Sequence, residues 1–275
     1  MRFGTVGSPK STPAKPGGSV GAVRQIAELG LDALELGWVQ SVRVSEETCA
    51  TIKHTSQDTG VAISVHAPYF INLNADETEW PKSRKRLWDA AFYGNLAGAT
   101  DIVFHPGSYF TRPSEEVLMV AIPRLKDLQT ELLGNEIRVN LRPETMGKQA
   151  MLGSLADTLE MSKSIAGVFP CVDFAHLYAR SGDGKPNDQK SWEYLLKDYQ
   201  NALGKDSLNH LHIHLSGIEF GPKGEKNHLA ARESGLNFEA LFKALRKYNC
   251  DGRIMCESPI LEEDALYFKE LWNSL

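Results

Sequence analysis

Carboxylates and histidines stand in this sequence where short apolar runs end. Asp173 and His176 lie three residues apart, at the point where the apolar run that ends at Val172 gives way to a polar loop containing Gly182. Burying a carboxylate and an imidazole at the end of a strand is costly unless another group compensates them. A divalent metal ion compensates both, because it binds ionised carboxylate and neutral imidazole together. One such pair is more typical of a hydrogen-bonded strand end, so the metal hypothesis depends on whether the pattern recurs.

The pattern recurs at the ends of six successive apolar runs. The residues concerned are His66, His105, Glu144, Asp173 with His176, His214 and Glu257, and His228 follows in the loop after His214. Mixed nitrogen and oxygen donors without paired cysteines favour Zn²⁺, with Mn²⁺ or Fe as further options. These candidates exceed the four ligands of one tetrahedral ion, so we expect at least two metal ions, with Glu144 able to bridge them. His210 and His212 alternate with His214 and are expected to be interior polar groups.

Two kinds of chemistry suit such a site. Paired metal ions lower the pKa of a shared water and neutralise the attacking and leaving oxygens of a phosphate ester. Metal ions also polarise a carbonyl during proton or hydride shifts on a sugar. The spacing of the candidate ligands does not separate these two reactions.

The apolar runs alternate with segments of helical period, as in repeated βα units with a parallel sheet. Strands are predicted at residues 2–6, 33–36, 61–65, 101–104, 137–141, 169–172, 208–215 and 253–256. Helices are predicted at residues 19–29, 45–58, 79–97, 114–133, 154–165, 192–203, 237–248 and 262–274, with Ser45 and Asn237 as N-caps.

Eight such units in 275 residues predict a single (β/α)8 TIM-barrel domain over residues 1–275. In this fold the functional residues stand at the C-terminal ends of the strands, which is where the candidate ligands fall. The alternative is an open doubly wound sheet, which needs a glycine-rich phosphate turn after the first strand. The segment Gly4–Pro9 lacks the spacing of that turn.

Composition limits the functional classes further. No apolar stretch is long enough for a membrane span, and the N-terminal residues are typical of a strand rather than a signal peptide. Cys49, Cys171, Cys250 and Cys256 form no closely spaced pair, so we expect a reduced, cytoplasmic setting. The net charge of −5 provides no general attraction to nucleic acid, so any phosphate-binding face must be local.

Over about residues 61–260 the sequence resembles the endonuclease IV family of apurinic/apyrimidinic endonucleases. The motifs that carry the resemblance are His66-Ala-Pro-Tyr-Phe-Ile-Asn-Leu-Asn74, Val103-Phe-His-Pro-Gly-Ser108, Pro143-Glu-Thr145, Val172-Asp-Phe-Ala-His-Leu-Tyr178, His214-Leu-Ser-Gly217 and Cys256-Glu-Ser-Pro259. The resemblance implies a (β/α)8 barrel with three zinc ions that hydrolyses DNA on the 5′ side of abasic sites during base excision repair.

Residue roles follow from the same resemblance. It implies that His66, His105 and Glu144 hold the first zinc ion, that Glu144, Asp173, His214 and Glu257 hold the second, and that His176 and His228 hold the third. Glu144, Asp173 and Glu257 are the implied catalytic carboxylates. Tyr69, Arg142, Lys223 and Lys226 are the candidate substrate-binding residues on the rim loops.

The sequence departs from the family pattern in three places. Lys226 occupies the position of an aspartate that completes the third zinc site, and the neighbouring Glu225 is a possible substitute. The loop at residues 37–44, which probes the abasic gap in the family, is short here. Arg142 replaces a less basic turn, where it either grips a phosphate or pairs with a nearby carboxylate.

Two further functions stay open. The related sugar isomerase and epimerase barrels share the fold and act on small sugars, although they usually use fewer histidines and one metal ion between two catalytic glutamates. A metal-stabilised barrel that binds nucleic acid or another partner without catalysis is the third possibility.

Overall fold

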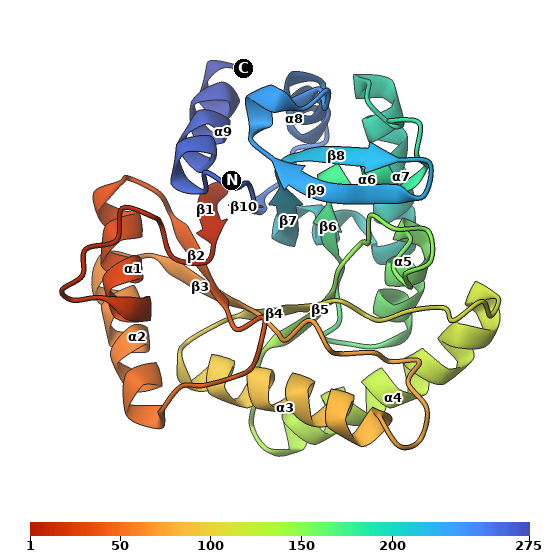
Figure 1. Ribbon diagram of the computed structural model, residues 1–275, viewed down its shortest axis with the longest axis horizontal. Coiled ribbons are helices and arrows are strands. Elements are labelled where there is room, and N and C mark those ends of the chain that lie inside the picture. Colours follow the sequence, from red (N-terminus) through yellow and green to blue (C-terminus); the bar gives the residue numbers. More distant parts are fainter.

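A closed barrel of eight parallel strands forms the centre of the computed structural model, which describes residues 1–275 (Figure 1). The strands are β1 (Arg2–Val6), β2 (Ala33–Gly37), β3 (Ala62–His66), β4 (Asp101–Phe104), β5 (Asn140–Pro143), β6 (Cys171–Asp173), β7 (Leu211–Leu215) and β10 (Gly252–Cys256). They pair in the order β5-β4-β3-β2-β1-β10-β7-β6. Parallel bridges from Leu141 to Val168 and from Glu144 to Cys171 join β5 to β6 and close the ring. The predicted TIM barrel is therefore confirmed.

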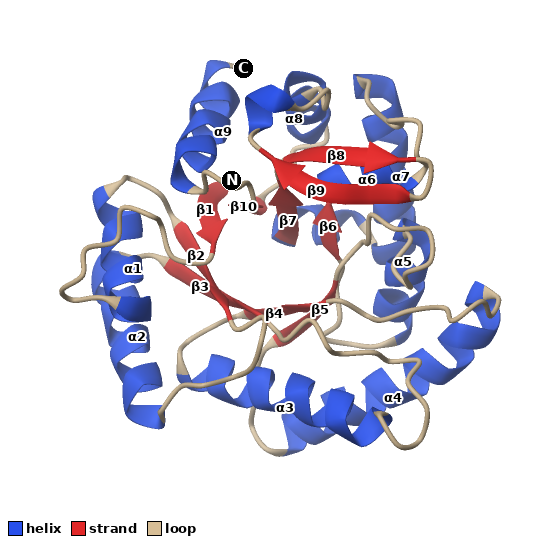
Figure 2. Cartoon of the chain, viewed as in Figure 1, coloured by secondary structure: helices blue, strands red, loops and turns tan.

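Helices surround the barrel on its outside (Figure 2). They are α1 (Gly18–Glu28), α2 (Glu46–Thr59), α3 (Trp80–Leu96), α4 (Ser114–Gly134), α5 (Leu155–Ser164), α6 (Phe174–Arg180), α7 (Gln189–Leu203), α8 (Phe238–Lys247) and α9 (Glu262–Ser274). The side chains of Ser45 and Asn237 cap α2 and α8 as predicted, each by accepting a hydrogen bond from a backbone N–H in the first turn.

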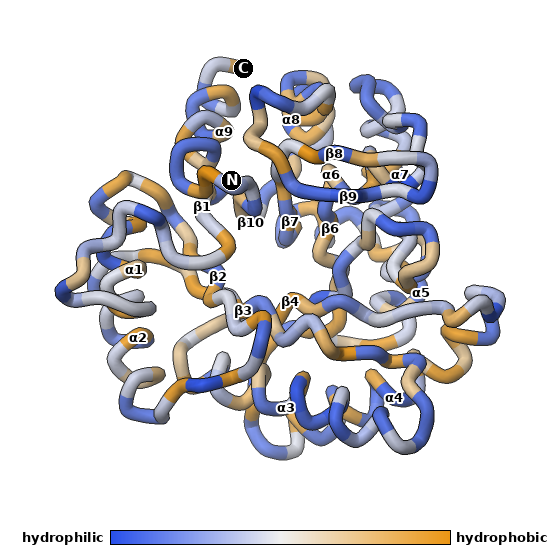
Figure 3. The backbone as a smooth tube through the Cα atoms, viewed as in Figure 1, coloured by the Kyte–Doolittle hydropathy of each residue, from blue (hydrophilic) through white to orange (hydrophobic).

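Apolar side chains from the helices and the strands form one continuous core. Along the outer helices hydrophobic residues alternate with hydrophilic ones, so that each helix buries one face against the barrel (Figure 3). This packing holds the strand ends in place. None of the helices combines the length and the apolar character needed to cross a membrane.

The structure corrects the predicted strands in two places. The fifth strand begins at Asn140 rather than Ile137, because Ile137 and Val139 are buried in the core without joining the ladder to β4. The seventh begins at Leu211, because residues 205–210 form a 3₁₀ helix in which Leu208 is buried. In both places burial by packing was mistaken for strand pairing.

One α-helix and two strands were not predicted. A short helix, α6, begins directly after β6, and its N-cap is Asp173. The strands β8 (Gly217–Gly221) and β9 (Gly224–Leu229) form an antiparallel hairpin that packs on α6 beside the C-terminal mouth of the barrel (Figure 1). β9 is polar except for Leu229, and β8 contributes only Ile218 and Phe220 as alternating apolar residues, which is too short a pattern to indicate strands.

Candidate metal centre

The eight predicted ligands come together at the C-terminal mouth of the barrel. Three overlapping groups have ligand atoms within 4.8 Å of one another: His66 with His105 and Glu144; Glu144 with Asp173, His214 and Glu257; and Asp173 with His176 and His228. Glu144 belongs to two of these groups, and so does Asp173. The arrangement therefore offers adjacent metal positions that share carboxylates.

Glu144 lies at the centre of the cluster and is fully buried. Its Oε2 atom is 3.4 Å from His66 Nε2 and 3.2 Å from His105 Nε2, and its Oε1 atom is 3.5 Å from His214 Nδ1. Neither carboxylate oxygen has a hydrogen-bond partner, and Asp173 Oδ2 and His214 Nδ1 also lack one. Buried polar atoms without partners are rare and costly, and cations between these oxygens and nitrogens would satisfy them. The residues present therefore fit a metal centre.

Backbone carbonyls determine the tautomers of three histidines in the cluster. The Nδ1 atom of His66 bonds to the carbonyl of Ala67 at 2.9 Å, and that of His176 bonds to the carbonyl of Thr145 at 2.8 Å. His228 Nδ1 bonds to the carbonyl of Glu257 at 3.2 Å. A carbonyl only accepts, so each Nδ1 carries the hydrogen and each Nε2 keeps a free lone pair. Histidines that bind metal are commonly held in this way.

The free lone pairs of His176 and His228 face each other. Their Nε2 atoms are 3.3 Å apart, and neither carries a hydrogen in the tautomer that its carbonyl partner imposes. Two lone pairs at this distance repel unless a proton or a cation lies between them. This pair is the best-defined feature of the third ligand group.

Charge coupling across the cluster shifts the pKa values strongly. Burial acts to raise the pKa of Glu144, but His105 and His214 outweigh it and hold that pKa well below its usual range. Burial acts to lower the pKa of His214, but Cys171, Glu257 and Glu35 outweigh it and raise that pKa well above 6.5. Burial and the neighbouring carboxylates Glu257 and Glu144 raise the pKa of Asp173. The cluster is a dense set of opposed charges in a buried site.

A β-bulge in the hairpin decides which acidic residue enters the cluster. Phe220 pairs with Glu225 and Glu219 pairs with Asn227, so Lys226 is the extra residue on β9. In a regular strand, residues three apart face opposite sides, but here Glu225 and His228 line the same cavity. Glu225 Oε2 is 3.6 Å from His176 Nε2.

Gly147 leaves room for the Glu225 side chain. A Cβ atom added at Gly147 would lie 2.7 Å from the Cβ of Glu225 and 3.0 Å from Cδ2 of His176. Lys226 turns away instead, and its Nζ atom lies 2.9 Å from Oε1 of Glu219. The carboxylate next to the third group therefore comes from Glu225 and not from position 226.

Glu35 is a buried acidic residue that the sequence analysis missed. It lies inside β2 with no exposed surface, and its two oxygens bond to the Nε2 atoms of His212 and His214 at 2.8 and 2.9 Å. A single acidic residue within the apolar run Ala33–Leu36 was the available signal. His212 is interior as predicted, and its pKa is lowered to about 4 chiefly by burial, whereas His210 is exposed.

Arg142 does not lie with the other predicted site residues. Its guanidinium is only 4% exposed, and its Nε donates to Asp101 Oδ1 at 2.5 Å. It also donates to the carbonyls of Pro170 and His210, which precede β6 and β7 at the opposite end of the barrel. The structure therefore corrects the expectation of a phosphate contact, and Arg142 follows the alternative of pairing with a nearby carboxylate.

Of the other predicted substrate-binding residues, Tyr69 borders the cavity over the cluster and the two lysines lie on the hairpin. The Tyr69 ring stacks on His105 with centroids 5.0 Å apart, and it is 46% exposed. Burial, then Glu257 and Glu144, raise the pKa of Tyr69 to about 12. Lys223 and Lys226 are exposed on the hairpin. Trp38, in the short loop after β2, is packed in the core.

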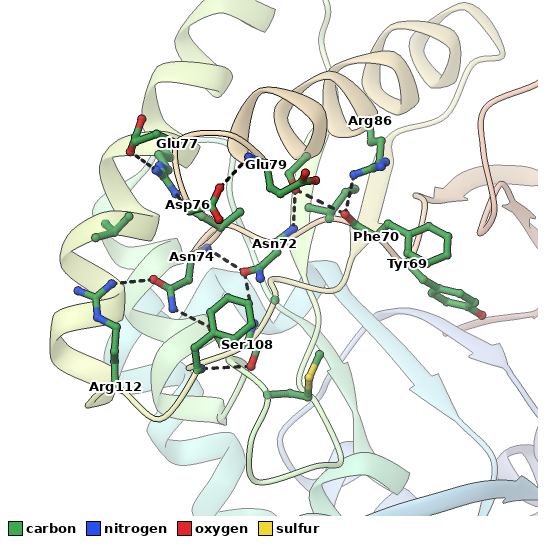
Figure 4. A pocket seen from close by; sticks show the side chains of 18 residues that line it. Tyr69, Phe70, Asn72, Asn74, Asp76, Glu77, Glu79, Arg86, Ser108 and Arg112 are labelled. Carbon is green, nitrogen blue, oxygen red and sulfur yellow. Dashed lines mark hydrogen bonds and ion pairs between the residues drawn. The ribbon is translucent and has the colours of Figure 1, made fainter.

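Two cavities meet at Tyr69. The smaller, of about 290 Å³, lies directly over the cluster and is lined by residues that include His105, His176, Glu225, His228 and Glu257. The larger, of about 940 Å³, extends outward between the loops after β3 and β4 (Figure 4). Phe70 and Phe110 line the larger cavity and are 59% and 58% exposed.

Comparison with known proteins places this architecture in a family. A family model described as xylose isomerase-like TIM barrel matches residues 23–271. The chain belongs to this family. An uncharacterised protein of Methanocaldococcus jannaschii is 37% identical over 274 residues, which cover 99% of this chain and 97% of that protein. Endonuclease 4 of Thermus thermophilus is 30% identical over 264 residues, which cover 93% of this chain and 91% of that protein.

Solved structures of similar fold include both enzyme classes considered from the sequence. The crystal structure of a Thermus thermophilus endonuclease IV superimposes with a TM-score of 0.75 at 22% identity, covering 100% of this chain and 98% of that one. A D-tagatose 3-epimerase-like protein superimposes with a TM-score of 0.74 at 20% identity, covering 100% of this chain and 96% of that one. These likenesses show the fold, and the choice of chemistry depends on the site.

Proposed function

We propose that this xylose isomerase-like barrel is a zinc-dependent phosphodiester hydrolase that cleaves DNA on the 5′ side of abasic sites. The observation that carries the proposal is the set of three overlapping ligand groups joined by Glu144 and Asp173. A reaction at a phosphodiester uses several cations, because charge develops on both the attacking and the leaving oxygen. A sugar isomerisation around a single metal ion has no need of the separate third group.

The residues that would hold the metal ions follow from the three groups. His66, His105 and Glu144 would hold the first ion, and Asp173, His214 and Glu257 would join Glu144 around the second. His176, His228 and Glu225 would hold the third, since the bulge brings Glu225 to their cavity. When bound, the ions supply an activated water and neutralise charge on the phosphate oxygens.

The protein itself positions the substrate. Tyr69 keeps its phenolic proton at neutral pH, because its pKa is raised to about 12, and its Oη can donate a hydrogen bond to a phosphate oxygen. Its ring holds His105 in place by stacking. The 290 Å³ cavity has the size for one sugar-phosphate unit, near the lower end of small-molecule sites.

The larger cavity supports a substrate longer than one sugar unit. Tyr69 lines both cavities, so a strand bound over the metal centre continues into the space beside Phe70 and Phe110. Exposed aromatic rings provide stacking surfaces for bases. Arg112, at the same cavity, adds a cationic group for the backbone.

A sugar epimerase is the second candidate. The observation that favours it is the small cavity, whose volume also suits a free monosaccharide facing Glu257. In that case the large aromatic cavity would have no part in catalysis. Binding of DNA without turnover would correspond to the third possibility, a non-catalytic barrel.

A duplex that contains one tetrahydrofuran residue tests the proposal, because this lesion cannot undergo β-elimination. The purified protein with zinc is expected to nick the damaged strand directly 5′ of the lesion and to leave the undamaged duplex intact. Glu144→Ala protein is the matched control for contaminating nucleases. Turnover of free ketoses without nicking would support the epimerase, and saturable DNA binding without either reaction would support the non-catalytic barrel.

A further inference from the structure

A buried carboxylate connects two histidines of the barrel interior. Glu35 on β2 receives hydrogen bonds from Nε2 of His214 at Oε1, and from Nε2 of His212 and Oγ of Ser64 at Oε2, at 2.9, 2.8 and 2.8 Å. All four residues have no exposed surface. Both oxygens of Glu35 are thus engaged by donors, so Glu35 is not itself available to a metal ion.

The bond to Glu35 determines how His214 faces the cluster. An ionised carboxylate only accepts, so Nε2 of His214 carries a hydrogen, and in the neutral ring that binds a metal ion the lone pair is on Nδ1. That Nδ1 atom lies 3.5 Å from Oε1 of Glu144 and 3.4 Å from Oε1 of Glu257, without a hydrogen-bond partner of its own. His214 is the one cluster histidine whose outer nitrogen is held by a carboxylate rather than by a backbone carbonyl.

We infer that Glu35 is the positioning residue for the metal ion held by Glu144, Asp173, His214 and Glu257, and that it acts through His214. The inference rests on the proposed metal centre. A carboxylate behind a metal-binding histidine orients the ring, selects its tautomer and increases the basicity of the opposite nitrogen. His212 and Ser64 donate to Oε2, the oxygen that His214 does not use, so Oε1 is left to His214 alone.

Glu35→Gln is the decisive variant. An amide has one accepting oxygen, so it cannot serve both His212 and His214 and it carries no charge. The expected result is a loss of affinity for one ion per chain by about 10–100-fold, measured by competition with a chromophoric zinc chelator, while the remaining ions keep their affinity.

Ser64→Ala is the matched control, since it removes one hydrogen bond from the same carboxylate and leaves the Glu35–His214 bond intact. Its zinc affinities are expected to stay within about threefold of the wild type. If Glu35→Gln binds every ion as tightly as Ser64→Ala does, the inference is overturned. If the wild type binds no zinc at all, the proposed metal centre itself is contradicted. This result is distinguishable from a failure of the inference about Glu35.

A measurement on the unaltered chain covers the case in which Glu35→Gln does not fold. Nitrogen-15 NMR of the metal-free protein with labelled histidine reports the tautomer of each ring, and His214→Gln assigns the signal. We expect His214 to carry its hydrogen on Nε2, with a hydrogen-bonded proton shift. A His214 ring that carries no hydrogen on Nε2 would overturn the inference without any change to Glu35.

Discussion

Buried charged groups are hydrogen-bonded at one end of the barrel and lack hydrogen-bond partners at the other. At the N-terminal end, Asp101 accepts from Arg142 at one oxygen and lies 3.1 Å from Arg253 at the other. At the C-terminal end, both oxygens of Glu144 and one oxygen of Asp173 have no hydrogen-bond partner. Charges joined by hydrogen bonds stabilise a fold, whereas buried carboxylate oxygens without a hydrogen-bond donor are suited to bind an ion. The comparison separates residues that hold the barrel together from residues available for chemistry.

The largest effect is expected from Glu144→Ala. This change removes the carboxylate shared by two ligand groups, so we expect fewer bound ions and a turnover at least about 1,000-fold lower, at the upper end of losses from one preorganised group. Nicking kinetics on the tetrahydrofuran duplex and elemental analysis measure the two effects. Urea denaturation of the variant checks that the loss of turnover is not a loss of folding. Full activity in this variant would show that Glu144 is not part of the active site.

Asp101→Ala should show the reverse pattern at the other end. Loss of this carboxylate leaves the buried guanidinium of Arg142 without its partner, which typically costs about 3–5 kcal/mol of unfolding free energy. Urea denaturation measures the loss, and zinc content per folded chain is expected to equal that of the wild type. A variant that keeps its stability but loses zinc would contradict the division between the two ends.

The pH dependence of the same pair has a definite sign. Burial acts to raise the pKa of Asp101, but Arg142 and Arg253 outweigh it and lower that pKa far below its usual value. A carboxyl group whose pKa is lower in the folded than in the unfolded state stabilises the fold at pH values above its unfolded pKa of about 3.9. That stabilisation is lost as the pH falls through the folded-state pKa. The stability difference between wild type and Asp101→Ala should therefore stay constant from pH 8 to about pH 5. A difference that shrinks around pH 6 would show that Asp101 is not held ionised by its arginines.

An intermediate effect is expected at the third ligand group. Glu225→Gln should lower the affinity for one ion by about 10–100-fold, a range typical of disturbed metal sites, because the cavity loses its carboxylate beside His176. Lys226→Gln, one residue along the same strand, is the matched control and should keep all ions. Equal zinc affinities in the two variants would mean that the bulge does not place Glu225 on the metal. His228→Ala should likewise reduce turnover less than Glu144→Ala does.

The smallest effect is expected on the hairpin surface. Lys223→Ala combined with Lys226→Ala should weaken DNA binding and reduce the slope of log affinity against log salt by about 1–2 units, since each phosphate contact contributes about 0.9. Lys226 already pairs with Glu219, so its share is expected to be the lesser one. Binding titrations between low and physiological salt measure the slope. An unchanged slope would show that these lysines belong to a solvated loop.

Much of the barrel could be predicted from the sequence. Apolar runs indicate the buried strands, and the helical repeat of apolar residues indicates the face of each helix that packs against the barrel. The limits of the helices were predicted closely where a cap was present, as at Ser45 and Asn237. The hairpin could not be predicted, since β9 is almost wholly polar and only Ile218 and Phe220 of β8 take part in apolar packing.

Those residues of the candidate site that stand at strand ends could be predicted from the sequence. His66 and Glu257 follow apolar runs directly and Glu144 stands three residues after Leu141, and the barrel then brings all three together. Glu35 was missed because it stands within a run, where only the three-dimensional path across the barrel shows that it meets His214. Glu225 was only a possible substitute for Lys226, because a bulge that reverses a side chain leaves no periodic signal in sequence.

The central claim is that the C-terminal mouth of the barrel is a metal centre with more than one ion. Elemental analysis of the protein, purified without chelators and normalised to chain concentration, tests it most directly. At least two ions per chain, mostly zinc, are predicted, and Glu144→Ala should hold fewer. A wild-type chain that contains one ion or none would contradict the account.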